Sequence, residues 1–112
     1  MSSLLNLIVK TLDDHHASSI EVLDFTLTSP IHDYSVIASV SNQRLAHAIV
    51  MYVEEEVEKH GFSVRQKEGN DQSKWMLIDC YDVVVHVFVG EEREVYQLEK
   101  LWNDLPRVEV KV

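Results

Sequence analysis

The sequence has 112 residues, which suits one small domain and leaves no room for a second hydrophobic core. Hydrophobic residues make up 46% of it, against three glycines and two prolines, so a packed globule is expected and a disordered or fibrous chain is excluded. Ten Lys and Arg against nineteen Asp and Glu give a net charge of -9, which opposes free binding to phosphate backbones. The acidic excess either keeps the domain soluble or attracts a basic protein.

Signals for compartment are few. Cys80 is the only cysteine, so an internal disulfide is impossible and a reducing cytoplasm is the expected location. Residues 1–12 mix polar side chains among their leucines and lack the apolar block of a secretory signal. No run approaches the roughly 18–20 apolar residues of a membrane helix, so we expect neither export nor membrane insertion.

The first half of the chain predicts two helices and two strands. Apolar residues at helical spacing, from Leu5 to Leu12, predict a short helix that Ser2 or Ser3 caps and that ends near His16. The next predicted elements are a strand at residues 20–25, a strand at 34–40, and the longest helix at about 43–60, with Asn42 as its N-cap and Gly61 as its stop.

The second half predicts three strands and a helix. These are a short strand at residues 62–66, a polar loop at 67–73, strands at 75–79 and 83–89, and an amphipathic helix at 91–102. The strands at 75–79 and 83–89 are close enough to form an antiparallel hairpin, and the near-continuous apolar run of 83–89 indicates a central strand covered on both faces. Pro106 is expected to end the ordered part. The resulting fold class is α/β (α+β), one domain with a mixed sheet of about five strands flanked by helices.

Asp79 and Asp82 form the only carboxylate pair that local structure would hold together. Such a pair can bind Mg²⁺ for nucleotidyl transfer, which also requires donors for a triphosphate, usually at a glycine-containing turn. The strand-to-helix turn at residues 39–42, Ser-Val-Ser-Asn, has no glycine to let backbone N–H groups approach a phosphate. A Mg-dependent nucleotidyltransferase therefore stands only as the alternative function, and no cofactor is expected.

The other reactive side chains also favour structural roles. No two of the six histidines have the i, i+4 spacing of a helical zinc motif, so no metal site is expected. His86 lies within the valine-rich strand, where a hydrogen-bonded core histidine is the expected interpretation. Cys80 has no basic neighbour in its own loop to lower its pKa, which argues against a nucleophile.

Trp75 and Tyr81 offer a different chemistry. If they are exposed beside Asp79 and Asp82, they form the kind of aromatic anchor and acidic rim that binds a basic protein. The alternative is a core tryptophan and a turn tyrosine, and the residues alone do not decide between the two.

Two segments of the chain resemble the ribosomal silencing factor (iojap-like) family. Residues 33–37, Asp-Tyr-Ser-Val-Ile, resemble its Asp-Tyr-Phe-Val-Ile element. Residues 75–88, Trp-Met-Leu-Ile-Asp-Cys-Tyr-Asp-Val-Val-Val-His-Val-Phe, resemble its Trp-x-Leu-Leu-Asp-Tyr-Gly-Asp-Val-Val-Val-His-Val-Phe core. The similarity continues through residues 93–102 and spans about 4–108. Two glycines of the family pattern are absent, one from the turn at 39–42 and one at Tyr81.

The resemblance implies a fold similar to the nucleotidyltransferase core without established catalysis. It also implies binding to large-subunit ribosomal protein fourteen, which sterically prevents the large and small subunits from joining and lowers translation when nutrients are scarce. Since a surface kept for a partner often pairs with itself in isolation, a homodimer is expected as well. The contact residues carried over by position are Trp75, Met76, Asp79, Tyr81, Asp82, Glu91 and Arg93.

Overall fold

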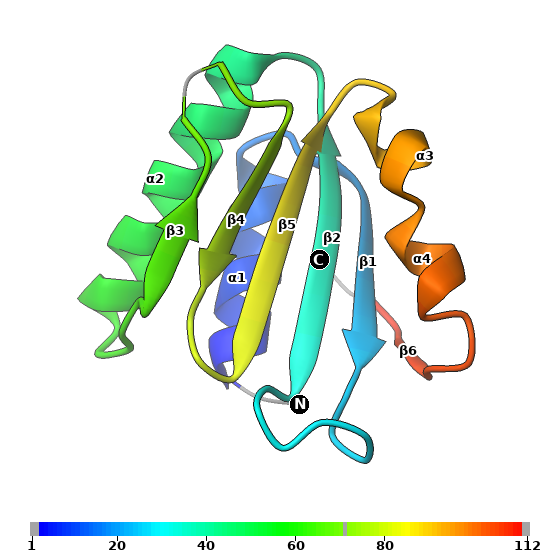
Figure 1. Ribbon diagram of the computed structural model, residues 1–112. Coiled ribbons are helices and arrows are strands. Elements are labelled where there is room, and N and C mark those ends of the chain that lie inside the picture. Colours follow the sequence, from blue (N-terminus) through cyan, green and yellow to red (C-terminus); the bar gives the residue numbers. More distant parts are fainter. Residues whose placement is uncertain (1–2, 71, 111–112) are drawn as a thin grey trace.

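A computed structural model describes residues 3–70 and 72–110. Its elements are α1 (Ser3–Asp14), β1 (Ser18–Asp24), β2 (Tyr34–Val40), α2 (Gln43–Lys59), β3 (Gln66–Glu68), β4 (Trp75–Asp79), β5 (Val83–Val89), α3 (Glu92–Tyr96), α4 (Leu98–Leu101) and β6 (Arg107–Val108). The strands form one mixed sheet in the order β3-β4-β5-β2-β1-β6, with α1 and α2 behind it and α3 and α4 beside β1 (Figure 1). The predicted class, a mixed sheet flanked by helices, is confirmed.

The centre of the sheet is the parallel pair β2 and β5, in which Tyr34 lies opposite Val83 and Val40 opposite Val89. Every other pairing is antiparallel, including the predicted hairpin of β4 and β5. A parallel pair needs a crossover connection, and α2 forms part of it. The bounds of β2, β4 and β5 agree with those predicted from the sequence.

One side of the sheet, which we call the covered face, packs against α1 and α2. Alternate residues of β5, Val83, Val85 and Val87, point to it and are fully buried. Leu5 of α1 and Ile49 of α2 meet them from the helix side, as members of the larger of two hydrophobic clusters. This cluster is aliphatic, and it forms the main core of the protein.

The long helix α2 begins and ends close to the predicted positions. The Asn42 side chain accepts a hydrogen bond from the Leu45 N–H at 2.8 Å, which confirms it as the N-cap. The helix ends at Lys59, and Gly61 follows with a φ of +88°. Among the described residues, no helix has the length and apolar character that crossing a membrane requires.

The predicted strand at 62–66 is wrong. Phe62 and Val64 pack against the covered-face cluster from irregular backbone, so their alternation with polar residues reflects burial and not strand pairing. The strand β3 begins only at Gln66 and takes up the start of the predicted polar loop.

The C-terminal part also differs from the prediction. The expected helix at 91–102 is divided into α3 and α4 by Gln97, whose φ of +51° and ψ of +47° are left-handed. After Pro106 the chain continues as β6, where Arg107 and Val108 pair with β1 and bring the sheet to six strands. At the other end, Ser3 is the first residue of α1, which ends at Asp14, and Ser2 lies outside the described residues.

Candidate functional site

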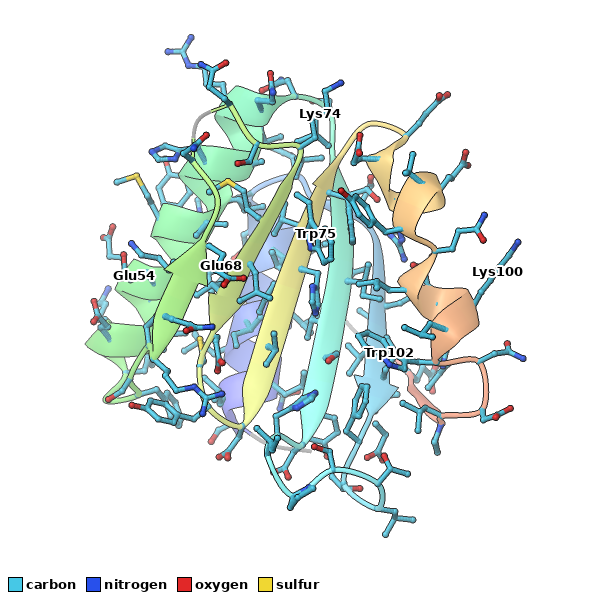
Figure 2. All side chains as sticks on the ribbon, viewed as in Figure 1. Glu54, Glu68, Lys74, Trp75, Lys100 and Trp102 are labelled. Carbon is cyan, nitrogen blue, oxygen red and sulfur yellow. The ribbon has the colours of Figure 1, made fainter. Side chains whose placement is uncertain are left out.

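The side of the sheet opposite α1 and α2 is only partly covered, and we call it the open face. Trp75 and Leu77 of β4 and Val84 of β5 lie on it and are half-buried, whereas Met76 and Ile78 point to the covered face and are buried. Leu98 of α4 packs over the β1 and β2 part of the open face, where it forms the second hydrophobic cluster with residues that include Leu23 and Ile37. Figure 2 shows Trp75 in front of the sheet, on the side away from α1 and α2.

Aromatic rings contact one another across the open face. The Trp75 ring lies 4.4 Å from the Tyr96 ring, centroid to centroid, and 5.1 Å from the Phe88 ring, on which it stacks with an interplanar angle of 24°. On its other side it meets His86 at 5.9 Å, and His86 meets Trp102 at 6.1 Å. Such contacts favour a rigid, shaped surface over a mobile one.

His86 orients Trp75. The Trp75 indole Nε1–H donates a hydrogen bond to His86 Nδ1 at 3.2 Å, which requires Nδ1 to be unprotonated. Burial lowers the pKa of His86 to about 4, with a smaller contribution from His32 in its charged form. The imidazole is therefore neutral near pH 7, and the expected hydrogen-bonded core histidine is confirmed.

The β4–β5 turn stands at one end of the open face. The buried Asp79 carboxylate accepts two hydrogen bonds from Arg65 at Oδ2, at 2.6 and 3.0 Å, and one from the Tyr81 N–H at Oδ1, at 2.9 Å. Tyr81 has a φ of +68°, and its exposed ring lies 5.3 Å from the Arg65 guanidinium carbon. The Asp82 carbonyl accepts hydrogen bonds from the N–H groups of residues 33 and 34, so the turn is fixed from both sides.

These contacts weaken the enzyme alternative. Asp79 is engaged by Arg65, whereas Asp82 is exposed, so the two carboxylates do not face a common cation. Among the residues that the structure describes, no three His, Cys, Asp or Glu side chains are grouped as a metal site requires. Burial, with the nearby Asp79 carboxylate, raises the pKa of the Cys80 thiol to about 12, which disfavours a nucleophile.

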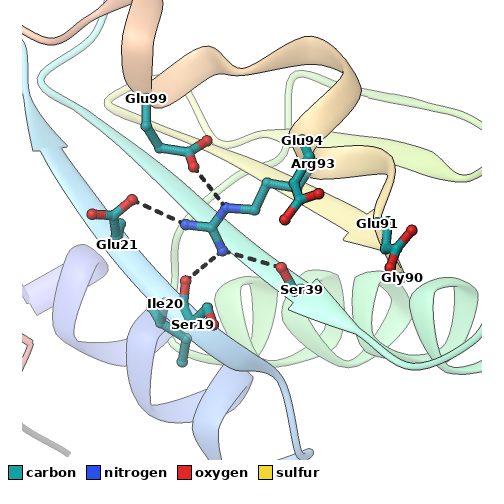
Figure 3. A pocket seen from close by; sticks show the side chains of 9 residues that line it. All are labelled: Ser19, Ile20, Glu21, Ser39, Gly90, Glu91, Arg93, Glu94 and Glu99. Carbon is teal, nitrogen blue, oxygen red and sulfur yellow. Dashed lines mark hydrogen bonds and ion pairs between the residues drawn. The ribbon is translucent and has the colours of Figure 1, made fainter.

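Arg93 holds α3 and α4 to the sheet. It lies in a pocket at the end of the sheet opposite the β4–β5 turn (Figure 3). Its guanidinium donates to the Ser19 carbonyl at 2.6 Å, to Ser39 Oγ at 3.1 Å, to Glu21 Oε2 at 3.0 Å and to Glu99 Oε2 at 3.1 Å. Sequence reasoning missed this network because Ser19, Glu21 and Ser39 lie more than fifty residues from Arg93 along the chain. The apolar spacing of residues 91–102 predicted that this segment packs against the protein, but not the polar contacts of Arg93.

The structure separates the seven predicted contact residues into two groups. Met76, Asp79 and Arg93 are buried, which corrects the expectation that their side chains face a partner. Each has another role, since Met76 packs in the core and the two charged groups are held in ion pairs. The residues that remain accessible are Trp75, Tyr81, Asp82 and Glu91, and their contact with a partner stays a prediction.

Comparisons with known proteins point to the same family as the sequence motifs. The family model described as "Ribosomal silencing factor during starvation" matches residues 1–112. The ribosomal silencing factor RsfS of Bacillus subtilis is 38% identical over 104 residues, which cover 93% of this chain and 88% of that protein. A crystal structure from Bacillus halodurans has a TM-score of 0.84 at 36% identity and covers 96% of this chain and 97% of that one.

A mouse protein is also similar. The protein named "Mitochondrial assembly of ribosomal large subunit protein 1" is 33% identical over 104 residues, which cover 88% of this chain and 45% of that longer protein.

Proposed function

The chain belongs to the ribosomal silencing factor family, and from that membership we propose that it lowers translation by binding the large ribosomal subunit in the cytoplasm. The proposed partner is large-subunit ribosomal protein fourteen. With this chain bound there, the small subunit is sterically prevented from joining when nutrients are scarce. The mouse relative is named for the large ribosomal subunit, which supports the choice of subunit.

The open face is the observation that carries this proposal. It presents Trp75, Leu77 and Val84 half-buried on the β4–β5 hairpin, with Tyr81 and Asp82 exposed at the turn. Aromatic side chains with restricted rotamers are common anchors of protein interfaces because they bury much area at little entropic cost. A net charge of -9 complements a basic ribosomal protein and opposes direct binding to bare RNA.

No observation favours the nucleotidyltransferase alternative to the same degree. The carboxylate that would bind Mg²⁺ first, Asp79, already satisfies an arginine fork and a backbone N–H. If Asp79 turned to a metal ion, the Arg65 guanidinium would lose its carboxylate partner and the Tyr81 N–H would lose its hydrogen bond. The geometry therefore supports a binding surface in preference to a catalytic centre.

We also propose that the open face pairs with a second copy of the chain in isolation. The same half-buried aromatic surface that fits a partner is uncovered in the free chain, so a homodimer would cover it. Sedimentation at micromolar concentration should show a dimer that Trp75→Ala weakens. A monomer at all concentrations would contradict this part of the proposal.

Calorimetry with purified large-subunit ribosomal protein fourteen tests the partner. We expect Trp75→Ala to weaken binding by about 2–4 kcal/mol, as truncation of an interface anchor does. Met51 is the matched control, because it is an exposed apolar residue of α2, behind the covered face, and Met51→Ala should leave the affinity unchanged. Equal losses in the two variants, or no heat of binding with the wild-type chain, would contradict the proposal.

A further inference from the structure

Tyr81 adopts a backbone conformation that its side chain opposes. Its φ of +68° lies in the left-handed region, where the Cβ of an L-residue crowds the following carbonyl oxygen. Four non-glycine residues among those described have a positive φ, and Tyr81 is the only one with a large aromatic ring. Tyr81 as a whole is 48% exposed, so burial of its side chain does not compensate the backbone strain.

The turn itself does not depend on the ring. The Tyr81 N–H donates to Asp79 Oδ1, and the Asp82 N–H donates to the Cys80 carbonyl at 2.9 Å. Arg65 fixes Asp79 with two hydrogen bonds. A glycine at position 81 could keep all of these bonds and would lose the strain, because they involve backbone atoms of the turn or other side chains.

The Tyr81 ring has a defined position at the end of the open face. The Arg65 guanidinium lies over the ring, with its central carbon 5.3 Å from the ring centroid, so one side of the ring is supported. The Arg65 side chain is 41% exposed. The neighbouring Asp82 carboxylate is exposed and, among the described residues, has no hydrogen-bond or ion-pair partner. An aromatic ring next to a free carboxylate fits a Lys or Arg side chain by a cation–π contact and a charged hydrogen bond.

We propose that Tyr81 is a specificity-determining contact of the open face, which takes a basic side chain of the ribosomal partner, and that Asp79 and Arg65 are its positioning residues. This inference rests on the proposed function. It assigns the strain at Tyr81 to binding, as strained residues at ligand contacts often are, and it separates what the backbone of residue 81 does from what its ring does.

Three substitutions at position 81 separate these two roles. Tyr81→Ala and Tyr81→Gly both remove the ring and its contact with Arg65, but only glycine also removes the strain. We expect both to weaken binding to purified bacterial large ribosomal subunits about tenfold, while Tyr81→Phe, which keeps the ring, stays within about twofold of the wild type. In thermal unfolding, Tyr81→Gly should melt about 4 °C above Tyr81→Ala.

His16 is the matched control for the strain. It is exposed in the α1–β1 connection with a φ of +71°, so His16→Gly should likewise melt above His16→Ala. Both His16 variants should bind the large subunit with wild-type affinity, since this connection does not belong to the open face. A loss of binding in His16→Gly but not in His16→Ala would show that strain relief alone perturbs the surface and would overturn the role of the ring.

The positioning role of Arg65 is tested by a double-mutant cycle. Arg65→Met should weaken binding about threefold when Tyr81 is present and should have no further effect when residue 81 is glycine, because Arg65 acts through the ring. Additive effects of the two substitutions would overturn the positioning role. Arg65→Lys should restore part of the affinity, since it keeps the charge over the ring and loses only the fork to Asp79.

The outcomes also separate this inference from the proposed function. If the wild-type chain binds and Tyr81→Gly binds equally well, the ring is no contact and the inference fails alone. Equal melting temperatures for the alanine and glycine variants would overturn the claim of strain. If the wild-type chain does not bind large subunits at all, the proposed function fails and the inference fails with it.

Discussion

The two faces of the central sheet are made by the same strands but are filled differently. On β5, Val83, Val85 and Val87 face α1 and α2, whereas Val84, His86 and Phe88 face the partly uncovered side. The covered face is aliphatic and closed by two helices of 12 and 17 residues, and the open face is aromatic and is flanked by helices of 5 and 4 residues. One strand therefore contributes to both the aliphatic core and the aromatic open face, and only its two-residue repeat separates the two sets of side chains.

The comparison predicts that stability depends mainly on the covered face. Ile49 of α2 is fully buried there, so Ile49→Ala should lower the free energy of unfolding by about 2–5 kcal/mol. Denaturant titration would measure this loss. At temperatures where the variant is folded, its affinity for the large subunit should equal that of the wild type, and a parallel loss of affinity would break the comparison.

The open face should make the stability of the fold depend on pH, through His86. The pKa of His86 is about 4 in the folded chain and near 6.5 when unfolded, so the unfolded chain binds its proton first as the pH falls. Stability is therefore full above about pH 6.5 and declines by up to about 3 kcal/mol on the way to pH 4. Denaturant titrations between pH 7 and 5 should show a steeper loss for the wild type than for His86→Asn, and equal slopes would contradict the account.

Helices α3 and α4, which flank the open face, should unfold locally when Arg93 is replaced. Its guanidinium joins α3 to β1, β2 and α4 through four hydrogen bonds, so Arg93→Met should lower the free energy of unfolding by about 2 kcal/mol. Hydrogen exchange should show that amides of residues 92–101 lose protection, while those of α1 and α2 keep it. Uniform loss of protection over the whole chain would show that the two faces do not unfold independently.

The smallest effect concerns one end of α2, on the covered side. Asn42→Ala removes the hydrogen bond to the Leu45 N–H and should destabilise the fold by about 1 kcal/mol. Thermal unfolding would detect the change as a lower Tm. Binding to the large subunit should not change, and Asn42→Ser, which keeps a capping oxygen, should recover most of the stability.

Sequence periodicity predicted the elements whose side chains face one environment. The alternation and length of residues 75–79 and 83–89 defined β4 and β5, and the four-residue spacing of 43–60 defined α2 to within one residue. It failed where distant segments decide the structure. The pairing of residues 107–108 with β1, and the left-handed break at Gln97, carry no local signal that we could find.

The candidate site shows the same division. The sequence pointed to Trp75, Tyr81 and the two aspartates, and the structure places all of these residues along β4 and its turn. It did not reveal that Arg65 engages Asp79, because that ion pair depends on how the segment before β3 approaches β4. Strand alternation alone could have placed Met76 on the face opposite Trp75, since neighbouring residues of a strand point to opposite sides.

Subunit joining is the most direct measure of the central claim that the open face blocks assembly of the ribosome. Purified large and small subunits are mixed with the chain, and light scattering follows their association. We predict that the wild-type chain and Met51→Ala suppress joining, whereas Trp75→Ala, with its fold confirmed by circular dichroism, does not. Full suppression of joining by the Trp75→Ala variant would contradict the account.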